Sequence, residues 1–378
     1  MTTLRSCIER CFGDIVYGDE LFWHQDLKPH TSGEFSIAVV QANSTLEDQG
    51  QVAATPFGTF IGVYDGHGGP EAARFVNNQL FPNFCKSAME QKGVSADVMR
   101  KAIVATEEEF LRSVERSFPY RPQIASVGTC CLVGAVTEDM LYVANLGDSR
   151  AVLGRCANPS GKDVVAERLT CDHNVSDVEI RKELKQMHPD DSDIVVHTRG
   201  VWRIKGIIQV SRSIGDAYLK KPELSRDPLF PQFVFPASPL KRSVITAEPS
   251  ILMRQLKPDD LFLIFASDGF WEQLTDAAAV DIVSKHPRSG IAKRLLRAAL
   301  EEAAKKVEMR YSDMKKIQKG VRRHFHDDIT VVVVYLDHNF RKSKGANFKA
   351  GTYRSMKTPA DIFSLHSHEP YSRLRPEP

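Results

Sequence analysis

Residues 59–70 read Thr-Phe-Ile-Gly-Val-Tyr-Asp-Gly-His-Gly-Gly-Pro, an apolar strand pattern followed at once by an acidic, glycine-rich turn. The first six residues have the β-branched, aromatic and small side chains typical of a buried β-strand. Asp65 follows directly, and the glycines around His67 allow the backbone to turn tightly. Pro70 and Glu71 then favour the first turn of a helix. The stretch therefore predicts a carboxylate held at the end of a rigid strand.

The same arrangement recurs at distant places in the chain. Asp268 follows a long apolar run, Asp148 follows a second strand pattern, Asp327 precedes a third, and Glu47 comes shortly after a fourth. Carboxylates at several strand ends can converge, and they would repel one another unless a cation neutralised them. Oxygen-only ligands favour Mg²⁺ or Mn²⁺ over zinc.

Each of these aspartates taken alone is equally compatible with a turn residue or a helix N-cap. Repetition of one pattern, an apolar strand and then a carboxylate, favours a shared site. His67, which alone would be an ordinary loop histidine, becomes a candidate proton donor beside Asp65. The residues thus point to a two-metal hydrolase acting on phosphoesters, and they leave the type of ester open.

Hydrophobic periodicity predicts an α+β fold. Several strands are separated only by turns, which indicates antiparallel hairpins. Longer helical stripes begin after Pro70, run over 99–114 and run over 291–307, and we expect these helices to cover sheet faces. The predicted strands are 35–41, 59–64, 129–136, 141–145, 207–210, 261–265 and 330–335.

Composition excludes several classes of protein. The 378 residues include 50 Lys+Arg and 48 Asp+Glu, and this net charge of +2 gives no reason to expect a nucleic-acid partner. No apolar run approaches the roughly 20 residues of a membrane span, and the first thirty residues lack a signal peptide's apolar region. Seven scattered cysteines without a Cys-x-x-Cys pair argue against a disulfide framework and against zinc. We therefore expect an intracellular protein.

The chain divides into three predicted segments. Residues 1–33 are expected to be an N-terminal extension, residues 34–338 a single catalytic domain and residues 339–378 a disordered tail. The tail carries eight basic residues against three acidic ones. This charge favours a solvated segment, with targeting to a membrane surface or to the nucleus as the alternatives. Residues 220–249 contain six prolines and are expected to form a long loop.

Five motifs in order resemble those of the metal-dependent protein serine/threonine phosphatases of type 2C. They are Val63–Gly69, Gly147–Arg150, Val210–Asp216, Ala266–Trp271 and Asp327–Thr330. The resemblance spans about residues 34–336, and it implies a four-layer α-β-β-α sandwich of two antiparallel sheets flanked by helices. The detailed sequences of residues 58–75, 206–221 and 321–334 resemble those of the plant subgroup called clade D.

The resemblance also implies roles for particular residues. His67 matches the general acid that protonates the leaving Ser or Thr oxygen, and a water activated by two metals attacks phosphorus without a phosphoenzyme intermediate. Asp148 and Glu272 match a weaker third metal site, although the family often has Asp at the latter position. The two main Mg²⁺ or Mn²⁺ ions are implied to be held by Asp65, which bridges them, Gly66 through its carbonyl, Asp268, Asp327 and Glu47.

The sequence departs from the family pattern in three places. Asn43 stands where many members have a phosphate-binding arginine, and Arg203 is a candidate substitute. Asp328 stands where Asn is common, and its added negative charge predicts a greater demand for metal. Trp202 is offset from the position of the tryptophan found in members inhibited by abscisic-acid receptors, and Arg199 falls there instead. We therefore do not expect this chain to be inhibited by such receptors.

Three functions are weighed on these grounds. The first is an active phosphatase of phosphorylated proteins with a role in signalling. The second is a phosphoprotein-binding adaptor without turnover, which Asn43 and Asp328 favour and the intact metal-ligand set opposes. The third is a hydrolase of small phosphoesters or nucleotides, against which the absence of a Gly-x-x-x-x-Gly-Lys loop counts.

The subgroup resemblance implies partners and a location. It suggests plasma-membrane proton pumps as substrates and small auxin-induced proteins as inhibitors. Residues 188–200 and 220–249 are the candidate partner contacts. The expected location is the cytoplasm, the nucleus or the periphery of the plasma membrane.

Overall fold

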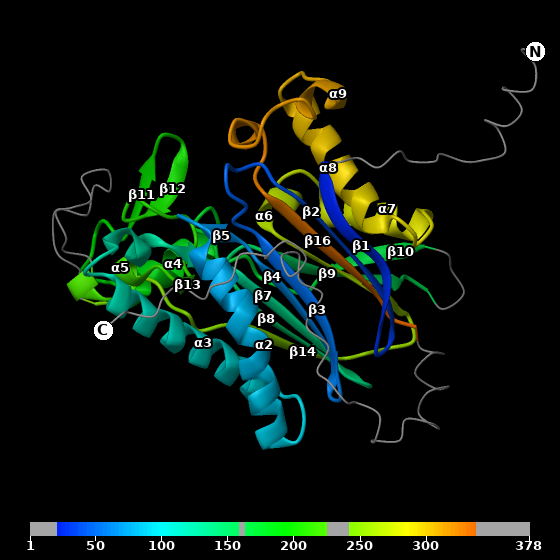
Figure 1. Ribbon diagram of the computed structural model, residues 1–378, viewed down its shortest axis with the longest axis horizontal. Helices are drawn as coiled ribbons and strands as arrows, with labels where there is room; N and C mark the ends of the chain where they lie inside the picture. Colours follow the sequence, from blue (N-terminus) through cyan, green and yellow to red (C-terminus); the bar gives the residue numbers. More distant parts are fainter. Residues whose placement is uncertain (1–20, 159–162, 225–241, 338–378) are drawn as a thin grey trace, which may run out of the picture.

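Two antiparallel β-sheets lie face to face in the computed structural model, which describes residues 21–158, 163–224 and 242–337 (Figure 1). The six-stranded sheet has the order β1 (Phe22–His30), β2 (Gly33–Val40), β16 (Ile329–Tyr335), β15 (Asp260–Ala266), β9 (Arg150–Cys156) and β10 (Val164–Arg168). The five-stranded sheet has the order β14 (Ser250–Gln255), β8 (Met140–Leu146), β7 (Cys131–Val136), β4 (Gly58–Tyr64) and β3 (Gln49–Thr55).

Long helices cover the outer face of each sheet, which confirms the predicted α-β-β-α layers. In Figure 1 the cyan pair α2 (Glu71–Gln91) and α3 (Ala96–Ser117) lies over the five-stranded sheet. The yellow pair α7 (Asp276–Lys285) and α8 (Ile291–Lys306) lies over the six-stranded sheet. Each helix buries one apolar stripe, so that three distinct cores form, one between the sheets and one under each helix layer.

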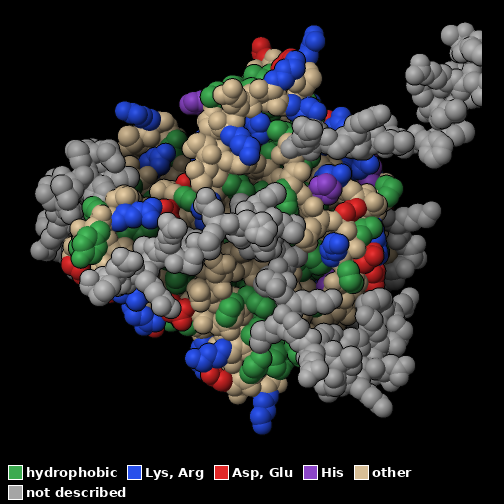
Figure 2. Space-filling view, in the orientation of Figure 1, with side chains coloured by type: hydrophobic (Ala, Val, Ile, Leu, Met, Phe, Trp, Pro, Cys, Tyr) green, Lys and Arg blue, Asp and Glu red, His purple; other side chains and the backbone are tan. Residues whose placement is uncertain are grey.

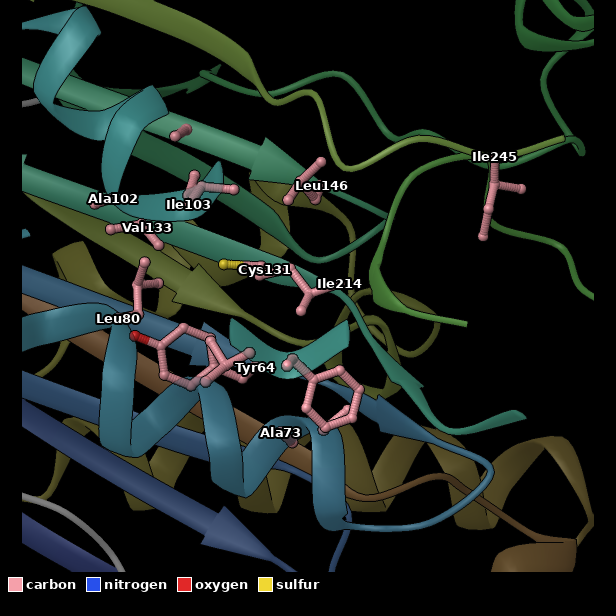
Figure 3. Close-up of a cluster of buried hydrophobic side chains, with 14 of the residues drawn as sticks. Tyr64, Ala73, Leu80, Ala102, Ile103, Cys131, Val133, Leu146, Ile214 and Ile245 are labelled. Carbon is pink, nitrogen blue, oxygen red and sulfur yellow. The ribbon is translucent and has the colours of Figure 1, made fainter. Parts of the chain in front are cut away.

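Helix α3 shows how local sequence and packing agree. Ser95 caps its N-terminus by accepting a hydrogen bond from the backbone N–H of Val98 (3.2 Å). The predicted apolar stripe from Met99 to Val114 is buried against the sheet. Figure 3 shows part of this layer, where side chains of the helices meet strand residues: Leu80, Ala102, Ile103, Tyr64 and Val133.

The core between the sheets is built from aromatic and branched side chains of both inner faces. Phe265 of β15 is fully buried there and points at Gly134 of β7. A Cβ atom at Gly134 would lie 2.5 Å from the Phe265 ring, so the glycine leaves the space that the ring fills. This packing fixes the two sheets relative to each other.

Short elements gather at one end of the sandwich and carry much of the site. Three two-residue strands, β5 (Gly66–His67), β6 (Gly128–Thr129) and β13 (Ile214–Gly215), pair there, and a hairpin of β11 (Val195–Thr198) and β12 (Val201–Ile204) projects beside them (Figure 1). The remaining α-helices of the described ranges are α4 (Val178–Met187), α5 (Ala217–Lys220), α6 (Asp268–Trp271) and α9 (Tyr311–Met314). The 3₁₀ turns are η1 (Pro122–Ser126), η2 (Pro222–Leu224) and η3 (Arg322–His324).

The structure differs from the predicted elements in two places. The predicted strand over 207–210 is wrong, because in the described structure this run makes only isolated bridges, to Asn174 and to Ile204 at the end of β12, and no continuous ladder. The predicted strand over 129–136 is interrupted at Cys130, whose N–H donates to the carbonyl oxygen of Asp65 (2.8 Å) instead.

The segments outside the predicted catalytic domain are partly described. Strand β1 lies within 1–33, which we expected to be an extension, and from Phe22 onward this segment pairs with β2 at the edge of the six-stranded sheet. The sequence did not predict β1, because an edge strand buries little apolar surface and many of its positions are polar and exposed. The tail over 339–378 and much of the proline-rich loop lie outside the described residues.

The described residues contain no helix that is long and apolar enough to cross a membrane. On the face shown in Figure 2, Lys and Arg side chains are dispersed among acidic and hydrophobic ones instead of gathering in one patch. This dispersal agrees with the near-neutral net charge of the chain.

We predict that Phe265→Ala lowers the free energy of unfolding by about 3–5 kcal/mol, because it opens a cavity between the sheets. Urea denaturation followed by fluorescence measures the change. Met253→Ala is the control, because Met253 lies 59% exposed on β14 and its loss is expected to cost less than about 0.5 kcal/mol. Equal effects of the two substitutions would contradict this account of the core.

Candidate functional site

A cavity of about 950 Å³ opens at one edge of the sandwich, and all eight predicted site residues line it. They come from both sheets and from the loops that follow their strands. They are Glu47, Asp65, Gly66, His67, Asp148, Asp268, Glu272 and Asp327.

Strand topology explains why these residues meet. Strands β4 and β8 both pair antiparallel with β7, so they run in the same direction and present Asp65 and Asp148 at the same edge. Strand β15 ends where its antiparallel neighbour β16 begins, which brings Asp268 and Asp327 to that edge from the other sheet. Residues more than 250 positions apart in sequence are therefore neighbours.

Turn geometry aims individual side chains into the cavity. Gly147 adopts φ +96, and a Cβ there would lie 2.2 Å from Cys130 Sγ, so only glycine fits the turn before Asp148. Asp148 is then held by Asn174 Nδ2 (2.6 Å) and by the Cys130 thiol (3.3 Å). On the opposite sheet, the backbone N–H of Asp268 donates to Asp65 Oδ2 (3.3 Å).

Burial and mutual repulsion raise the pKa of every carboxyl group in this cluster. Burial, then Asp48 and Asp327, hold the pKa of Asp65 well above its ordinary value. Burial, then the Asp328 charge, raises the pKa of Glu47 to about 7. Burial is also the main cause that raises the pKa of the remaining carboxyl groups in the cluster: Asp148, Asp268, Glu272 and Asp327. The cluster is therefore short of positive charge.

The donor set fits a hard divalent cation. Among the described residues, no group of three or more His, Cys, Asp or Glu side chains is already arranged to hold a metal ion. The carboxylates line the wall of the cavity instead. All of the candidate acidic ligands offer oxygen, which suits Mg²⁺ or Mn²⁺. At Gly66 a Cβ would lie 2.6 Å from the Glu47 carbonyl oxygen, so the bare backbone runs close beside the loop that carries Glu47.

Asp328 plays a structural part that the sequence did not predict. Its buried Oδ1 accepts hydrogen bonds from the backbone N–H groups of Ala42 (2.6 Å) and Asn43 (2.9 Å), and its Oδ2 accepts from that of Glu47 (2.8 Å). The side chain therefore holds the loop that presents Glu47. It does not line the cavity, although its charge raises the pKa of Glu47.

Asp48, which follows Glu47 after the same strand pattern in the sequence, is a buried carboxyl group beneath the site. Asp48 accepts a hydrogen bond from Ser267 Oγ (2.8 Å), and burial followed by the Asp328 charge holds its pKa well above the ordinary value. The acidic pair Glu47–Asp48 before β3 was the available signal. The structure separates the two, with Glu47 on the cavity wall and Asp48 behind it.

The sequence named Arg203 as the candidate cation of the site, whereas the structure also places Arg323 beside the carboxylates. Arg323 Nη2 lies 2.8 Å from Asp327 Oδ2, its side chain is 51% exposed and it lines the cavity. Asn43 Nδ2 contacts both Glu47 Oε2 (3.3 Å) and Asp327 Oδ1 (3.3 Å). Arg203 also lines the cavity, but its Nη1 donates to the Ile207 carbonyl oxygen (2.8 Å).

His67 stands beside the carboxylates and contacts an aspartate that sequence reasoning did not single out. Its Nε2 lies 2.8 Å from Asp216 Oδ2. Burial opposes protonation of the ring, but the Asp216 carboxylate outweighs it and raises the pKa of His67. Asp216 lies in one of the five motifs, so its place in the sequence was visible while its contact was not.

Comparisons with known proteins agree with this geometry. The family model described as "Protein phosphatase 2C" matches residues 37–307. The rice protein "Probable protein phosphatase 2C 78" is 65% identical over 96% of this chain and 93% of its own length. The Arabidopsis thaliana protein "Probable protein phosphatase 2C 63" is 62% identical over 97% of this chain and 96% of its own length.

A solved structure shares the fold at much lower identity. The serine-threonine phosphatase 2C from Toxoplasma gondii superimposes with a TM-score of 0.57 at 17% identity, covering 83% of this chain and 98% of that one. Together with the family match over most of the chain, these similarities decide the assignment. The chain belongs to the protein phosphatase 2C family, and it is therefore a metal-dependent serine/threonine phosphatase.

Proposed function

We propose that this chain hydrolyses phosphoserine and phosphothreonine in proteins at the cavity described above, with two divalent cations and without a phosphoenzyme intermediate. The observation that carries the proposal is the convergence of carboxylates from both sheets on one cavity wall, each with a raised pKa, beside a histidine.

The residues would divide the work by position. Asp65 would serve both Mg²⁺ or Mn²⁺ ions and the Gly66 carbonyl oxygen would serve one of them, with Asp268 and Asp327 on the first ion and Glu47 on the second. Asp148 and Glu272 would hold a weaker third ion. When bound, such cations neutralise phosphate charge and make a bound water more acidic.

Direct attack by water is favoured over attack by Cys130, a thiol of the cavity wall. Cys130 lines the wall, but burial and then the Asp148 charge hold its pKa well above the ordinary value. A thiol that keeps its proton is a poor nucleophile. His67 would donate a proton to the leaving Ser or Thr oxygen, which lowers the cost of expelling an alkoxide.

The substrate's phosphate also needs a cation from the protein, and Arg323 is the proposed one. Its guanidinium is half exposed on the cavity wall and opposes the burial that raises the pKa values of Glu47 and Glu272. It is therefore within electrostatic reach of Glu47, Glu272 and Asp327. The exposed nitrogens suit a charge-assisted contact to phosphate oxygens. We prefer Arg323 to Arg203, the candidate from the sequence.

The finer biological assignment rests on the resemblance to the plant clade D subgroup. That resemblance supports plasma-membrane proton pumps as substrates and small auxin-induced proteins as inhibitors. It also supports action in the cytoplasm, in the nucleus or at the inner face of the plasma membrane. The high identity to rice and Arabidopsis relatives is compatible with a plant signalling role.

We predict that a phosphothreonine peptide releases phosphate only when Mn²⁺ or Mg²⁺ is added. Asp65→Asn and Asp268→Asn should each lower kcat about a hundredfold or more at saturating metal, because each removes a charged oxygen ligand. Asp139→Asn, in the exposed turn between β7 and β8, is the matched control and should keep full activity. Metal binding without turnover on several phosphopeptides would contradict the proposal and favour the adaptor.

We further predict that Mn²⁺ raises the Tm of the protein and that this increment grows between about pH 5 and pH 7. The pKa of Glu47 is raised from 4.5 to about 7, so its proton competes with the cation throughout this window.

Calorimetry with Mn²⁺ and with a chelator at each pH measures this increment. Asp268→Asn should show a smaller increment at every pH. An increment that is constant or shrinks as the pH rises would mean that the carboxyl groups of the cavity do not hold the metal.

Arg323→Ala should raise KM for the phosphopeptide and weaken inhibition by inorganic phosphate about tenfold, with a smaller effect on kcat, because a charged hydrogen bond to phosphate is lost. Adding Asn43→Arg should restore part of this loss, since residue 43 contacts the same carboxylates. Steady-state kinetics measures both. A tenfold loss in Arg203→Ala, with Arg323→Ala unchanged, would instead assign the phosphate contact to Arg203.

A further inference from the structure

The contact between His67 and Asp216 joins two elements that are 149 residues apart in sequence. The Asp216 side chain is fully buried, whereas the His67 ring is 31% exposed on the cavity wall. Asp216 Oδ2 also accepts a hydrogen bond from Ser213 Oγ (2.6 Å). The other oxygen, Oδ1, is buried and has no hydrogen-bond partner in the described structure. The carboxylate therefore directs its charge at His67.

The backbone of Asp216 is held in a conformation that side chains rarely adopt. Its φ of 49 and ψ of 44 lie in the left-handed region, which is unfavourable for a residue other than glycine. Three contacts offset this cost. The N–H of Asp216 donates to Val127 O (2.9 Å), that of Gly215 donates to Glu107 Oε2 (2.9 Å), and Lys220 Nζ contacts Glu107 Oε1 (2.6 Å).

The backbone at Gly128 leaves space for the contact between His67 and Asp216, and a larger residue at this position would clash with both side chains. Gly128 of β6 pairs with His67 of β5, while Gly215, directly before Asp216, pairs with the same glycine from β13. A Cβ atom at Gly128 would lie 2.2 Å from Asp216 Oδ2 and 2.4 Å from His67 Nε2. Three short strands thus clamp the histidine and the aspartate against a bare stretch of backbone.

We propose that Asp216 is the positioning residue for His67, holding the Nε2–H group so that Nδ1 faces the oxygen leaving the phosphate. No hydrogen bond to Nδ1 is formed by any residue in the described ranges, and the ring lines the cavity. The inference rests on the proposed role of His67 as proton donor.

The proton balance of the step follows from this geometry. As the phosphorus–oxygen bond breaks, its electron pair stays on the Ser or Thr oxygen, which takes the proton from Nδ1. The imidazole that remains is neutral and keeps Nε2–H directed at Asp216. The buried carboxylate orients the ring throughout and does not touch the substrate.

The test compares two substrates that differ in their need for this proton. A phosphoserine peptide expels an alkoxide, whereas p-nitrophenyl phosphate expels a stable phenolate that needs little protonation. The kcat/KM for the phosphoserine peptide divided by the kcat/KM for p-nitrophenyl phosphate is therefore sensitive to proton donation, and we call this quotient the ratio. It does not depend on the fraction of the protein that is folded, because both reactions use the same active molecules.

Asp216→Gly is the informative substitution, because glycine accepts the left-handed backbone without strain and removes only the side chain. We expect it to lower the ratio about 10- to 100-fold. His67→Gln should lower the ratio at least as much. The double variant should match His67→Gln alone, since the aspartate acts only through the histidine.

Glu308→Gly is the matched control. Glu308 has nearly the same φ (54), is exposed at the end of α8 and does not line the cavity, so its ratio should equal that of the unmodified protein. Asp216→Asn, which keeps the shape and removes the charge, provides a second variant if Asp216→Gly folds poorly, and its ratio should also fall.

The outcomes separate this inference from the proposed function. An unchanged ratio in His67→Gln would overturn the proton-donor role itself. A lowered ratio in His67→Gln, with the ratio unchanged in Asp216→Gly and Asp216→Asn, would overturn only the positioning role. Equal losses on both substrates in the Asp216 variants, or a further loss in the double variant, would also overturn it and leave Asp216 a purely structural residue.

Discussion

Repulsion among buried carboxylates is the constraint on which the rest of this structure depends. Six of the acidic side chains that line the cavity form the cluster described above, and burial together with their mutual charge raises the pKa of each of the six. Such a cluster is tolerated only where a rigid scaffold holds it and a cation neutralises it. Two sheets locked by the aromatic and branched core between them supply the scaffold. The buried carboxylates thus destabilise the edge of the sandwich, and the packed core between the sheets offsets this cost.

Acidic residues of one type serve two different purposes around the cavity. Asp65 and Asp268 face the cavity, where their oxygens are available to a cation. Asp328 and Asp216 are buried behind it and bind protein groups, a loop in one case and the His67 ring in the other. The difference lies in burial and partners, since each of these aspartates stands near the end of a strand or in a tight turn.

Sequence patterns selected residues that the structure brings to one cavity, because most of them stand near a strand end that is visible in the sequence. All eight line the cavity. Sequence patterns were less successful where a residue acts through a partner that is distant in the sequence. Asp216, Arg323 and Asp48 carry no periodic signal, and their contacts arise only when the two sheets close. The predicted strand over 207–210 failed for a related reason, since an apolar run becomes a strand only when another strand pairs with it.

The sequence by itself determined the α+β class, the family and the candidate acidic ligands, because strand periodicity, ordered motifs and strand-end carboxylates are all visible along the chain. Only the tertiary structure decided which acidic side chains face the cavity, which cation stands beside them and which nitrogen of His67 is held by the protein. Such features depend on contacts between residues far apart in the sequence, like the hydrogen bond from the Ala42 N–H to Asp328, which joins residues 286 positions apart. No local pattern encodes such contacts, because the packing of the two sheets creates them.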